Sequence, residues 1–555
     1  MNGLKNFWAR YRADVGWMIL LGAIALAARL PALFTIPRFT DEVLEWQFAF
    51  EIARGARNPL LGLQPYLGPF GSDLLALALW LAPHPFTPRA FSALMGALTI
   101  PATYALGAAL GGRRVGFIAG LLMATSSAHI VVNSHIAYVN SLTPLFAALS
   151  LTCVYVARGR DDGRFLIAGG FLFGLAAQTH PLTFALGPGI VLWFFSARSF
   201  WKWFRRPALY LALGAALLAY YPVWYALWTQ PDFFRAQVVT RSYAFALPSS
   251  LGEYAGNAQG LLVELARMVG AVYPNLSAPR AYLLQPLVFL YALGLLVAAW
   301  AMRAQKNYFL GWVIGSAVLC IPLVNKQYGD FPYFTRYLAL LLPPLYAAVA
   351  FGLVTLWTKL ETRFVAARAR WILHASAWGA IGLLALMPLS LTAEFYAGQQ
   401  RGGRTNATFL EITARVAQTP TDLILLDKEL GGAEFPSGGN LLLSFQVWFD
   451  LQKQTWRAVQ VAPRQLQNCA AGQWLIATRA NAVRTATRCR IRTIVEQEMP
   501  TRPGRPSIYF GLYQLQGPRA EQGVRQISNW TYRTDIRILL TGLGRGHIIG
   551  ALSRE

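Results

Sequence analysis

The residues best suited to chemistry in this chain are the acidic neighbours Asp41 and Glu42. They follow the first apolar segment, Val15–Phe34, in a half of the chain that holds few other acids. Charged side chains in or beside a bilayer are costly to keep there, so they usually mark a functional site. A carboxylate held at the membrane surface suits general-base chemistry, in which it removes a proton from a nucleophile within hydrogen-bond reach. We expect one acid of the pair to be the base and the other to orient it or the acceptor.

The alternative for these acids is that they are simply solvated, as loop acids usually are. The preceding residues, Pro37-Arg38-Phe39-Thr40, hold the pair close to the end of the apolar segment and favour a functional role. Glu45 and Glu51 follow at helical spacing and are predicted to form a solvated helix face.

Three further segments carry polar residues at the ends of apolar runs. In HIVVNSHIAYVN, His135, Tyr138 and Asn140 are predicted to face the same compartment as Asp41, and His180 ends another run on that face. Hydrogen bonding to a sugar or a pyrophosphate and polar satisfaction at a tight turn explain the first segment equally well. A lone histidine such as His180 is more often structural.

The third segment reads NKQYGDFPYFTR and is followed by Tyr337. Arg336 is predicted to bind a phosphate bidentately at the depth of a lipid headgroup, and Lys326 lies in the same segment. Tyr337 is a candidate for substrate binding, although interfacial tyrosines also serve as membrane anchors. In the long loop before this segment, Glu264 and Arg267 are three residues apart and are expected to pair on a helix.

Composition places these residues in a polytopic membrane protein. Of 555 residues, 55% are hydrophobic and 13% are charged, and the mean hydropathy is +0.39. The net charge of +24 comes from Lys and Arg residues that lie mostly in short loops between apolar runs. This distribution indicates membrane topology and affinity for anionic lipid headgroups, and it argues against nucleic-acid binding. No nucleotide-binding glycine motif, HExxH motif or metal-type Cys/His spacing occurs, so no cofactor is predicted, and a need for a divalent cation stays open.

The fold class predicted is mainly α, with about eleven transmembrane helices and a small C-terminal extracytoplasmic α/β domain. The apolar run Gly71–Ala82 is predicted to be an interfacial helix, because counting it as a span would scramble the alternation of basic loops. The predicted spans are Val15–Phe34, Arg89–Leu110, Val115–Val132, Ala137–Ala157, Phe165–Gln178, Pro181–Phe195, Pro207–Trp228, Tyr282–Ala301, Tyr308–Val324, Tyr337–Trp357 and Trp371–Thr392. The N-terminus is then cytoplasmic and the C-terminus outside.

Two domains follow from this pattern. Residues 1–392 form the membrane domain, with outer loops 35–88 and 229–281, and residues 393–555 form the outer domain. In the outer domain Thr408–Gln418 is predicted to be helical. Strands are predicted at Leu423–Leu426, Leu441–Trp448, Trp474–Thr478 and Ile508–Leu515. In an oxidising compartment Cys469 and Cys489 are expected to form a disulfide, whereas Cys153 and Cys320 are expected to be buried hydrophobes.

The chain resembles the GT-C superfamily of integral-membrane glycosyltransferases. It is similar in particular to bacterial members of glycosyltransferase family 39, which are related to protein mannosyltransferases and to the aminoarabinose transferase that modifies lipid A. The residues that carry the resemblance are FTDEVLEWQFAFEIARG, RAFSALMGALTIPATYALGAALGGRRVGFIAGLLMATSSAHIVVNSH, FLIAGGFLFGLAAQTHP and FTRYLALLLPPLYAAVAFGL. Relatives often carry arginine at the position of His135 and a His-Pro-Pro motif where this chain reads YLGPFGSD, so its substrate is expected to differ.

The resemblance implies transfer of a sugar, with inversion, from a polyprenyl-phosphate donor to a protein, lipid or glycan acceptor. It implies that the reaction occurs on the outer face of a membrane, here a bacterial plasma membrane. An acid of the Asp41-Glu42 pair would be the base, with Asp41 as the first choice and Glu42 orienting it or the acceptor. Arg336 or Lys326 would help to hold the phosphate. Two other classes stay open: a flippase or transporter of a lipid-linked sugar, and a non-catalytic cell-envelope assembly protein.

Overall fold

The structure is a computed structural model. It describes residues 2–518 except 32, 35–39, 135–137, 197–199, 242–245, 271–285, 329–334, 364–366, 402–403, 419–422, 433–440, 452–456, 462–468 and 500–507. The chain forms two compact units. The first contains Met1–Pro31, Asn58–Leu74 and Arg89–Phe395, and the second contains Ala32–Arg57, Leu75–Pro88 and Tyr396–Glu555.

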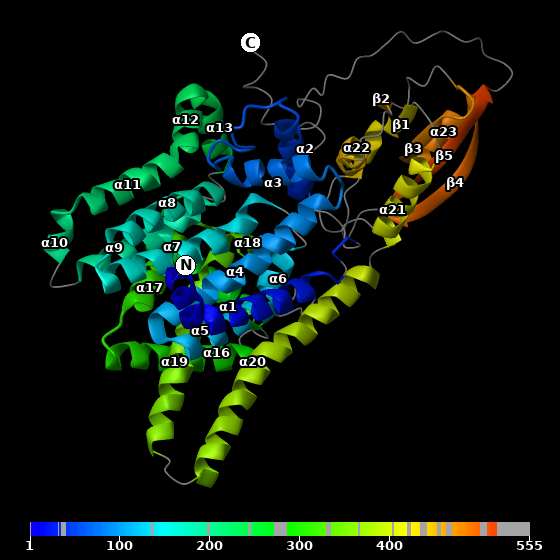
Figure 1. Cartoon of the computed structure of the whole chain (residues 1–555). Helices are drawn as coiled ribbons and strands as arrows, with labels where there is room; N and C mark the ends of the chain where they lie inside the picture. The colour runs from blue at the N-terminus through cyan, green and yellow to red at the C-terminus, as the bar shows by residue number, and fades with distance from the viewer. Residues whose placement is uncertain are drawn as a thin grey trace. The chain divides into compact units, whose positions relative to one another are not determined.

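The first unit is helical (Figure 1). Its helices before the long outer segment are α1 (Asn2–Arg29), α4 (Thr87–Gly111), α5 (Arg113–Thr125), α6 (Ser127–Val132), η1 (Val139–Leu142), α7 (Thr143–Arg160), α8 (Gly163–Thr179), η2 (Pro181–Leu186), α9 (Gly187–Phe195), α10 (Phe200–Phe204), α11 (Pro207–Ala219) and α12 (Tyr221–Thr229). The others are α13 (Pro231–Arg241), α14 (Leu251–Gly270), α16 (Pro286–Ala304), α17 (Phe309–Val324), α18 (Thr335–Leu338), η3 (Ala339–Leu341), α19 (Leu342–Arg363) and α20 (Ala367–Arg401).

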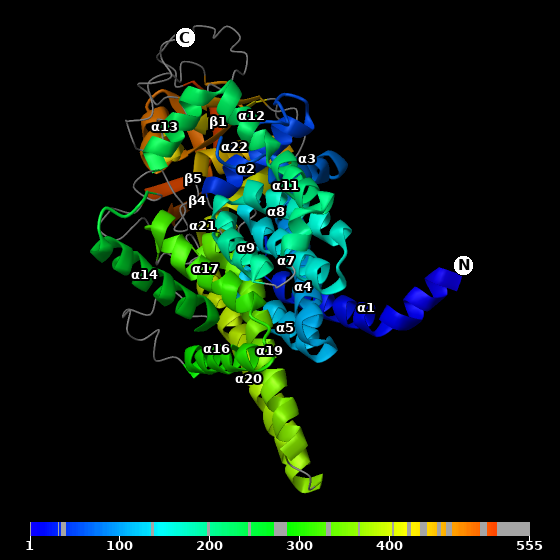
Figure 2. The ribbon, with the colours of Figure 1, turned by 90° about the vertical axis from the view of Figure 1, so that its left-hand side faces the viewer.

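Small residues let several of these helices approach closely. A Cβ added at Gly170 or Gly174 of α8 would collide with the backbone of α11 at Ala212 or Ala216. Gly352 of α19 meets α16 in the same way, with Ala298 N at 2.6 Å from such a Cβ. Helices in lipid gain most of their association energy from this kind of close packing. Figures 1 and 2 show α16 beside α19 in both views.

The apolar segments expected from the sequence are helical in the part of the chain that the structure describes. Among the described residues, five helices are long and apolar enough to cross a membrane, and there are six if α11 and α12, bent by 51° at their junction, form one span. The chain is a multi-pass membrane protein. The run predicted to be interfacial is the twelve-residue helix α3 (Phe70–Leu81).

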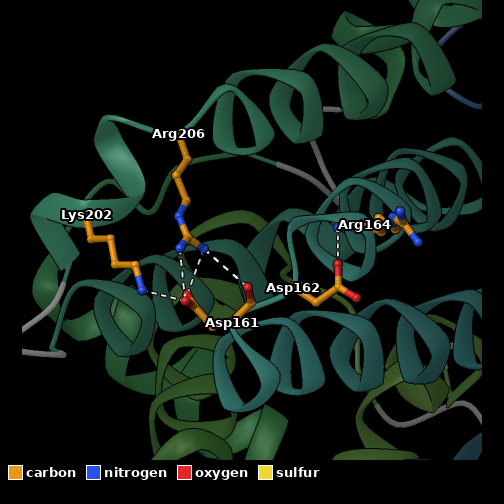
Figure 3. A network of polar contacts seen from close by, with 5 residues as sticks. All are labelled: Asp161, Asp162, Arg164, Lys202 and Arg206. Carbon is orange, nitrogen blue, oxygen red and sulfur yellow. Dashed lines mark hydrogen bonds and ion pairs between the residues drawn. The ribbon is translucent and has the colours of Figure 1, made fainter.

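An exposed polar network connects two turns of the first unit (Figure 3). Asp161, at the end of α7, accepts hydrogen bonds from Arg206 at 2.7 and 2.9 Å and pairs with Lys202 of α10. Lys202 first and Arg206 second lower the pKa of the Asp161 carboxyl. Asp162 caps the next helix by accepting from the backbone N–H of Arg164 at 2.9 Å. These contacts fix the turn between α7 and α8 to the start of α11.

The second unit contains a mixed five-stranded sheet in the order β2-β1-β3-β5-β4. Its strands are β1 (Leu423–Asp427), β2 (Arg457–Val461), β3 (Trp474–Thr478), β4 (Cys489–Met499) and β5 (Ile508–Pro518). Its helices are α2 (Thr40–Ala53), the part of α3 from Leu75 onward, α21 (Arg404–Ala417), η4 (Lys428–Gly432), α22 (Leu441–Leu451) and α23 (Arg479–Ala486). Strand β1 pairs in parallel with β2 and β3, and β5 pairs antiparallel with β3 and β4.

The sheet has a core on each face because successive strand residues point to opposite sides. Ile424 and Leu426 pack with Phe409 of α21 and Phe445 of α22. Leu425 instead joins the cluster that contains Ala482 of α23 and both disulfide cysteines. Cys469 and Cys489 are disulfide-bonded, with their Cα atoms 5.4 Å apart.

One strand prediction in this unit is wrong. Residues Leu441–Trp448 lie in helix α22. Nearly all of its residues are apolar or buried, and such a run has no periodicity that separates a strand from a buried helix. Leu441, Phe445 and Phe449 recur every four residues and are buried on the side that meets Phe409. Packing of this apolar stripe against Phe409 therefore favours a helix over a strand for this segment.

Candidate functional site

Arg336 lies in the one-turn helix α18, where the helical run Thr335–Arg363 begins. Its side chain is only 2% exposed. The guanidinium carbon lies 4.9 Å from the ring centre of Tyr138 and 5.1 Å from that of Tyr337, and Nη2 donates to the Tyr337 hydroxyl at 3.1 Å. A guanidinium stacked on aromatic faces has its N–H groups around its edge, which is the geometry that binds phosphate bidentately.

His180 extends this aromatic group. It caps the end of α8, and its ring stacks on that of Tyr337 with centroids 4.8 Å apart and planes 24° apart. Its Nδ1 accepts from the backbone N–H of Leu182 at 3.3 Å, which fixes the ring at the start of η2. The structural role predicted for a lone histidine is therefore present, and it places the ring against a residue of the predicted binding set.

The 3-10 helix η1 supplies Tyr138 and Asn140. Tyr138 precedes η1 and meets Arg336, and η1 packs against α18 and α8. Asn140 is buried at 1% exposure. The structure thus brings together Arg336, Tyr337, Tyr138 and His180, from elements far apart in sequence. His135, the remaining predicted member of this segment, lies outside the described residues.

Glu264 of α14 contacts the residue that precedes Arg336. It is completely buried, accepts from Thr335 Oγ1 at 2.5 Å and pairs with Arg267 Nη1 at 3.2 Å. The pairing of residues 264 and 267 on one helix is as predicted. Thr335 directly precedes Arg336, so Glu264 helps to fix the backbone that carries the arginine.

Lys326 lies in a different environment. Its Nζ is 2.5 Å from Glu253 Oε1, at the other end of α14. Lys326 and, after it, Ser249 lower the pKa of the Glu253 carboxyl to about 2. The ammonium is thus already engaged by a carboxylate, which makes Arg336 the stronger candidate for a phosphate.

Asp41 and Glu42 belong to the second unit. They lie in the first turn of α2, which packs against α22. The Glu42 side chain is completely buried. The predicted solvated face of this helix is wrong, because Glu45 is 2% exposed and Glu51 pairs with Arg57 at 2.6 Å. Helical spacing alone cannot tell which face of a helix is buried when both faces hold large apolar residues.

A buried polar pair in the first unit was not predicted. Arg29, the last residue of α1, donates to Ala25 O at 2.7 Å and lies 2.6 Å from His129 Nδ1 through Nη2. Gly96 of α4 makes room for it, since a Cβ there would meet Arg29 Nε and Asn133 Cβ at 2.8 Å. An arginine near the end of the first apolar run was the available signal.

Within the described residues, no cluster of three or more His, Cys, Asp or Glu side chains could hold a metal ion.

Comparisons with known proteins add sequence and fold relationships. Residues 69–226 match the family described as dolichyl-phosphate-mannose-protein mannosyltransferase. No curated protein is significantly similar to the chain in sequence. The structure of ArnT from Cupriavidus metallidurans bound to undecaprenyl phosphate has a TM-score of 0.52 at 15% identity, over 89% of this chain and 98% of that one. Its apo state gives 0.55 at 14% identity, over 90% and 98%.

At identities this low the ArnT structures establish a shared fold. The family match independently covers the segment that contains Tyr138, Asn140 and His180. The resemblance expected from the sequence is thus confirmed: the chain is similar to GT-C integral-membrane glycosyltransferases of the mannosyltransferase type and has the fold of ArnT.

Proposed function

We propose that this protein transfers a sugar from a polyprenyl-phosphate donor to an acceptor on the outer face of a membrane. The observation that carries the proposal is Arg336, buried at the end of a span between the rings of Tyr138 and Tyr337. An arginine at that depth suits the phosphate of a polyprenyl lipid. The fold is shared with an ArnT structure bound to undecaprenyl phosphate, which supports a donor of this class.

In the proposed reaction an acceptor hydroxyl or amine attacks the anomeric carbon of the sugar while Asp41 removes its proton. The bond between that carbon and the phosphate oxygen breaks, the configuration inverts, and polyprenyl phosphate leaves with its charge met by Arg336. Asp41 and Glu42 lie in the first turn of helix α2.

The proposed topology has eleven spans, a cytoplasmic N-terminus and an outer C-terminal α/β domain, in a bacterial plasma membrane. It divides the chain at residues 392 and 393. Basic residues in alternate loops support this orientation, and the disulfide between Cys469 and Cys489 suits an oxidising compartment.

The test is sugar transfer by purified protein in nanodiscs. Radiolabelled polyprenyl-phosphate sugars would be supplied with a membrane extract as acceptor, and wild type compared with Asp41→Asn. Label that enters an acceptor with wild type alone supports the proposal. Saturable donor binding without transfer, together with movement of the donor between leaflets, would instead favour a transporter of lipid-linked sugars.

A further inference from the structure

Asn140 has a feature that the phosphate site does not explain. It is 1% exposed, yet neither its Nδ2 nor its Oδ1 has a hydrogen-bond partner among the described residues. Buried amides are nearly always satisfied, because a polar group without a hydrogen bond is costly to bury. Such a side chain is expected to meet a ligand that is able to donate and to accept.

The backbone around Asn140 is held by its neighbours, so its amide is kept available. Asn133 Nδ2 donates to the carbonyl of Ser141, and Ser92 Oγ donates to Ser141 Oγ at 3.3 Å. A Cβ at Gly71 would collide with the Val139 side chain, so the start of α3 packs directly on η1. The preceding Tyr138 contacts Arg336, which places η1 beside the proposed phosphate site.

The chemistry of an amide distinguishes between ligand groups. A phosphate offers only acceptors, so it would satisfy Nδ2 and leave Oδ1 unpaired. An ammonium offers only donors, so it would satisfy Oδ1 and leave Nδ2 unpaired. Neighbouring hydroxyls of a sugar both donate and accept, and they satisfy both atoms at once. Asn133 Oδ1, also buried without a partner in the described part of the chain, adds a second acceptor for a hydroxyl.

Glu264 already accepts from Thr335 and pairs with Arg267, so its carboxylate is engaged within the protein. Asp73 lies two residues after Gly71 on α3, outside the predicted spans, and burial raises the pKa of its carboxyl to about 7. Both observations agree with an uncharged ligand.

We infer that Asn140 selects an uncharged, hydroxylated sugar on the polyprenyl-phosphate donor, and discriminates against amino sugars. The inference rests on the proposed function, because it assumes that Arg336 holds the donor phosphate next to η1. Asn140 is thus a specificity-determining residue. Its replacement by aspartate, which only accepts, should turn the preference towards a sugar that carries an ammonium group.

The test measures the affinity of the full-length protein in nanodiscs for three ligands: polyprenyl phosphate, polyprenyl-phosphate hexose and a polyprenyl-phosphate amino sugar. Wild type should bind the hexose lipid about tenfold more tightly than bare polyprenyl phosphate, the worth of two net hydrogen bonds. Asn140→Ala should lose that factor, and Asn140→Asp should prefer the amino-sugar lipid. The matched control is Asn257→Ala, which removes a buried amide that donates to Pro322 O at 3.1 Å.

Binding of bare polyprenyl phosphate distinguishes a failure of the Asn140 inference from a failure of the proposed function. It also shows that each variant is folded. If Asn140→Ala binds all three lipids as wild type does, Asn140 holds only water and the inference is wrong while the proposed function stands. A wild-type preference for the amino-sugar lipid would also overturn the inference. If wild type binds none of the three lipids, the proposed function fails and the inference with it.

Discussion

Replacing Thr335 with valine should loosen the helix turn that carries Arg336. The substitution keeps the shape of the side chain and removes the hydroxyl that donates to Glu264 Oε1 at 2.5 Å. Thr335 and Glu264 are both completely buried, so no solvent can replace the lost bond. Helix α18 contains only four residues, Thr335–Leu338, and gains little stability from its own backbone bonds.

The size of the effect follows from the chemistry of the bond. Hydrogen bonds to a charged group contribute about 1.5–3 kcal/mol to stability. If about half of this free energy is lost from donor binding because Arg336 is displaced, the Kd for polyprenyl phosphate should rise by roughly threefold to tenfold. A change of about 1.4 kcal/mol in binding free energy is a factor of ten in Kd. The thermal midpoint should fall as well, since the buried Glu264 carboxyl is left with one donor fewer.

The assay is equilibrium binding of radiolabelled polyprenyl phosphate, with the thermal midpoint measured on the same samples. Thr103→Val is the matched control, because Thr103 is equally buried and its hydroxyl donates to Thr99 O at 2.9 Å within α4. Adding Glu264→Gln to each variant completes a double-mutant cycle, which should show coupling with Thr335 and additivity with Thr103. If Thr335→Val matches Thr103→Val in both measurements, Glu264 does not position Arg336.

Two other contacts give independent predictions. The lowered pKa of Glu253 means that its bond with Lys326 stabilises the start of α14 above about pH 4.5 and is lost as the pH falls towards about 2. Lys326→Met should move this loss to higher pH. The measurement is the pH dependence of hydrogen exchange at the first α14 amides, corrected for intrinsic rates, which should lose protection at a higher pH than in wild type. An unchanged pH profile would contradict the pairing. The disulfide between Cys469 and Cys489 closes a 20-residue separation, so Cys469→Ala should destabilise the second unit by about 3 kcal/mol. Limited proteolysis near β4 should then be faster, and equal rates in both proteins would show that the sheet holds this region without the bond.

The sequence predicted local features well where one residue pattern has one structural outcome. The five buried residues of Trp474–Thr478, bounded by turn residues, form the expected strand. Glu264 and Arg267 pair across one helical turn as expected. The run Leu441–Trp448 failed because an unbroken apolar segment fits a buried helix as well as a strand, and its partner Phe409 lies far away in sequence.

Long-range polar contacts were beyond prediction for a physical reason. The contact between Arg29 and His129 spans a hundred residues and depends on Gly96, a small residue with no polar signal. Strand β4 was missed because most of its residues are arginine, threonine, glutamate or glutamine, so its apolar alternation is too short to stand out. The sequence nevertheless indicated the residues around Arg336, because polar and aromatic side chains at the ends of apolar segments are costly to keep without a use.

The most direct test of the central claim compares donor binding and transfer in Asp41→Asn and Arg336→Ala. Single-turnover reactions would use the polyprenyl-phosphate sugar that wild type transfers. The account predicts that Asp41→Asn binds the donor like wild type but loses at least about a hundredfold in transfer, which is the low end of a general base's contribution. Arg336→Ala should lose donor affinity. Normal transfer by Asp41→Asn, or normal donor binding by Arg336→Ala, would contradict the account.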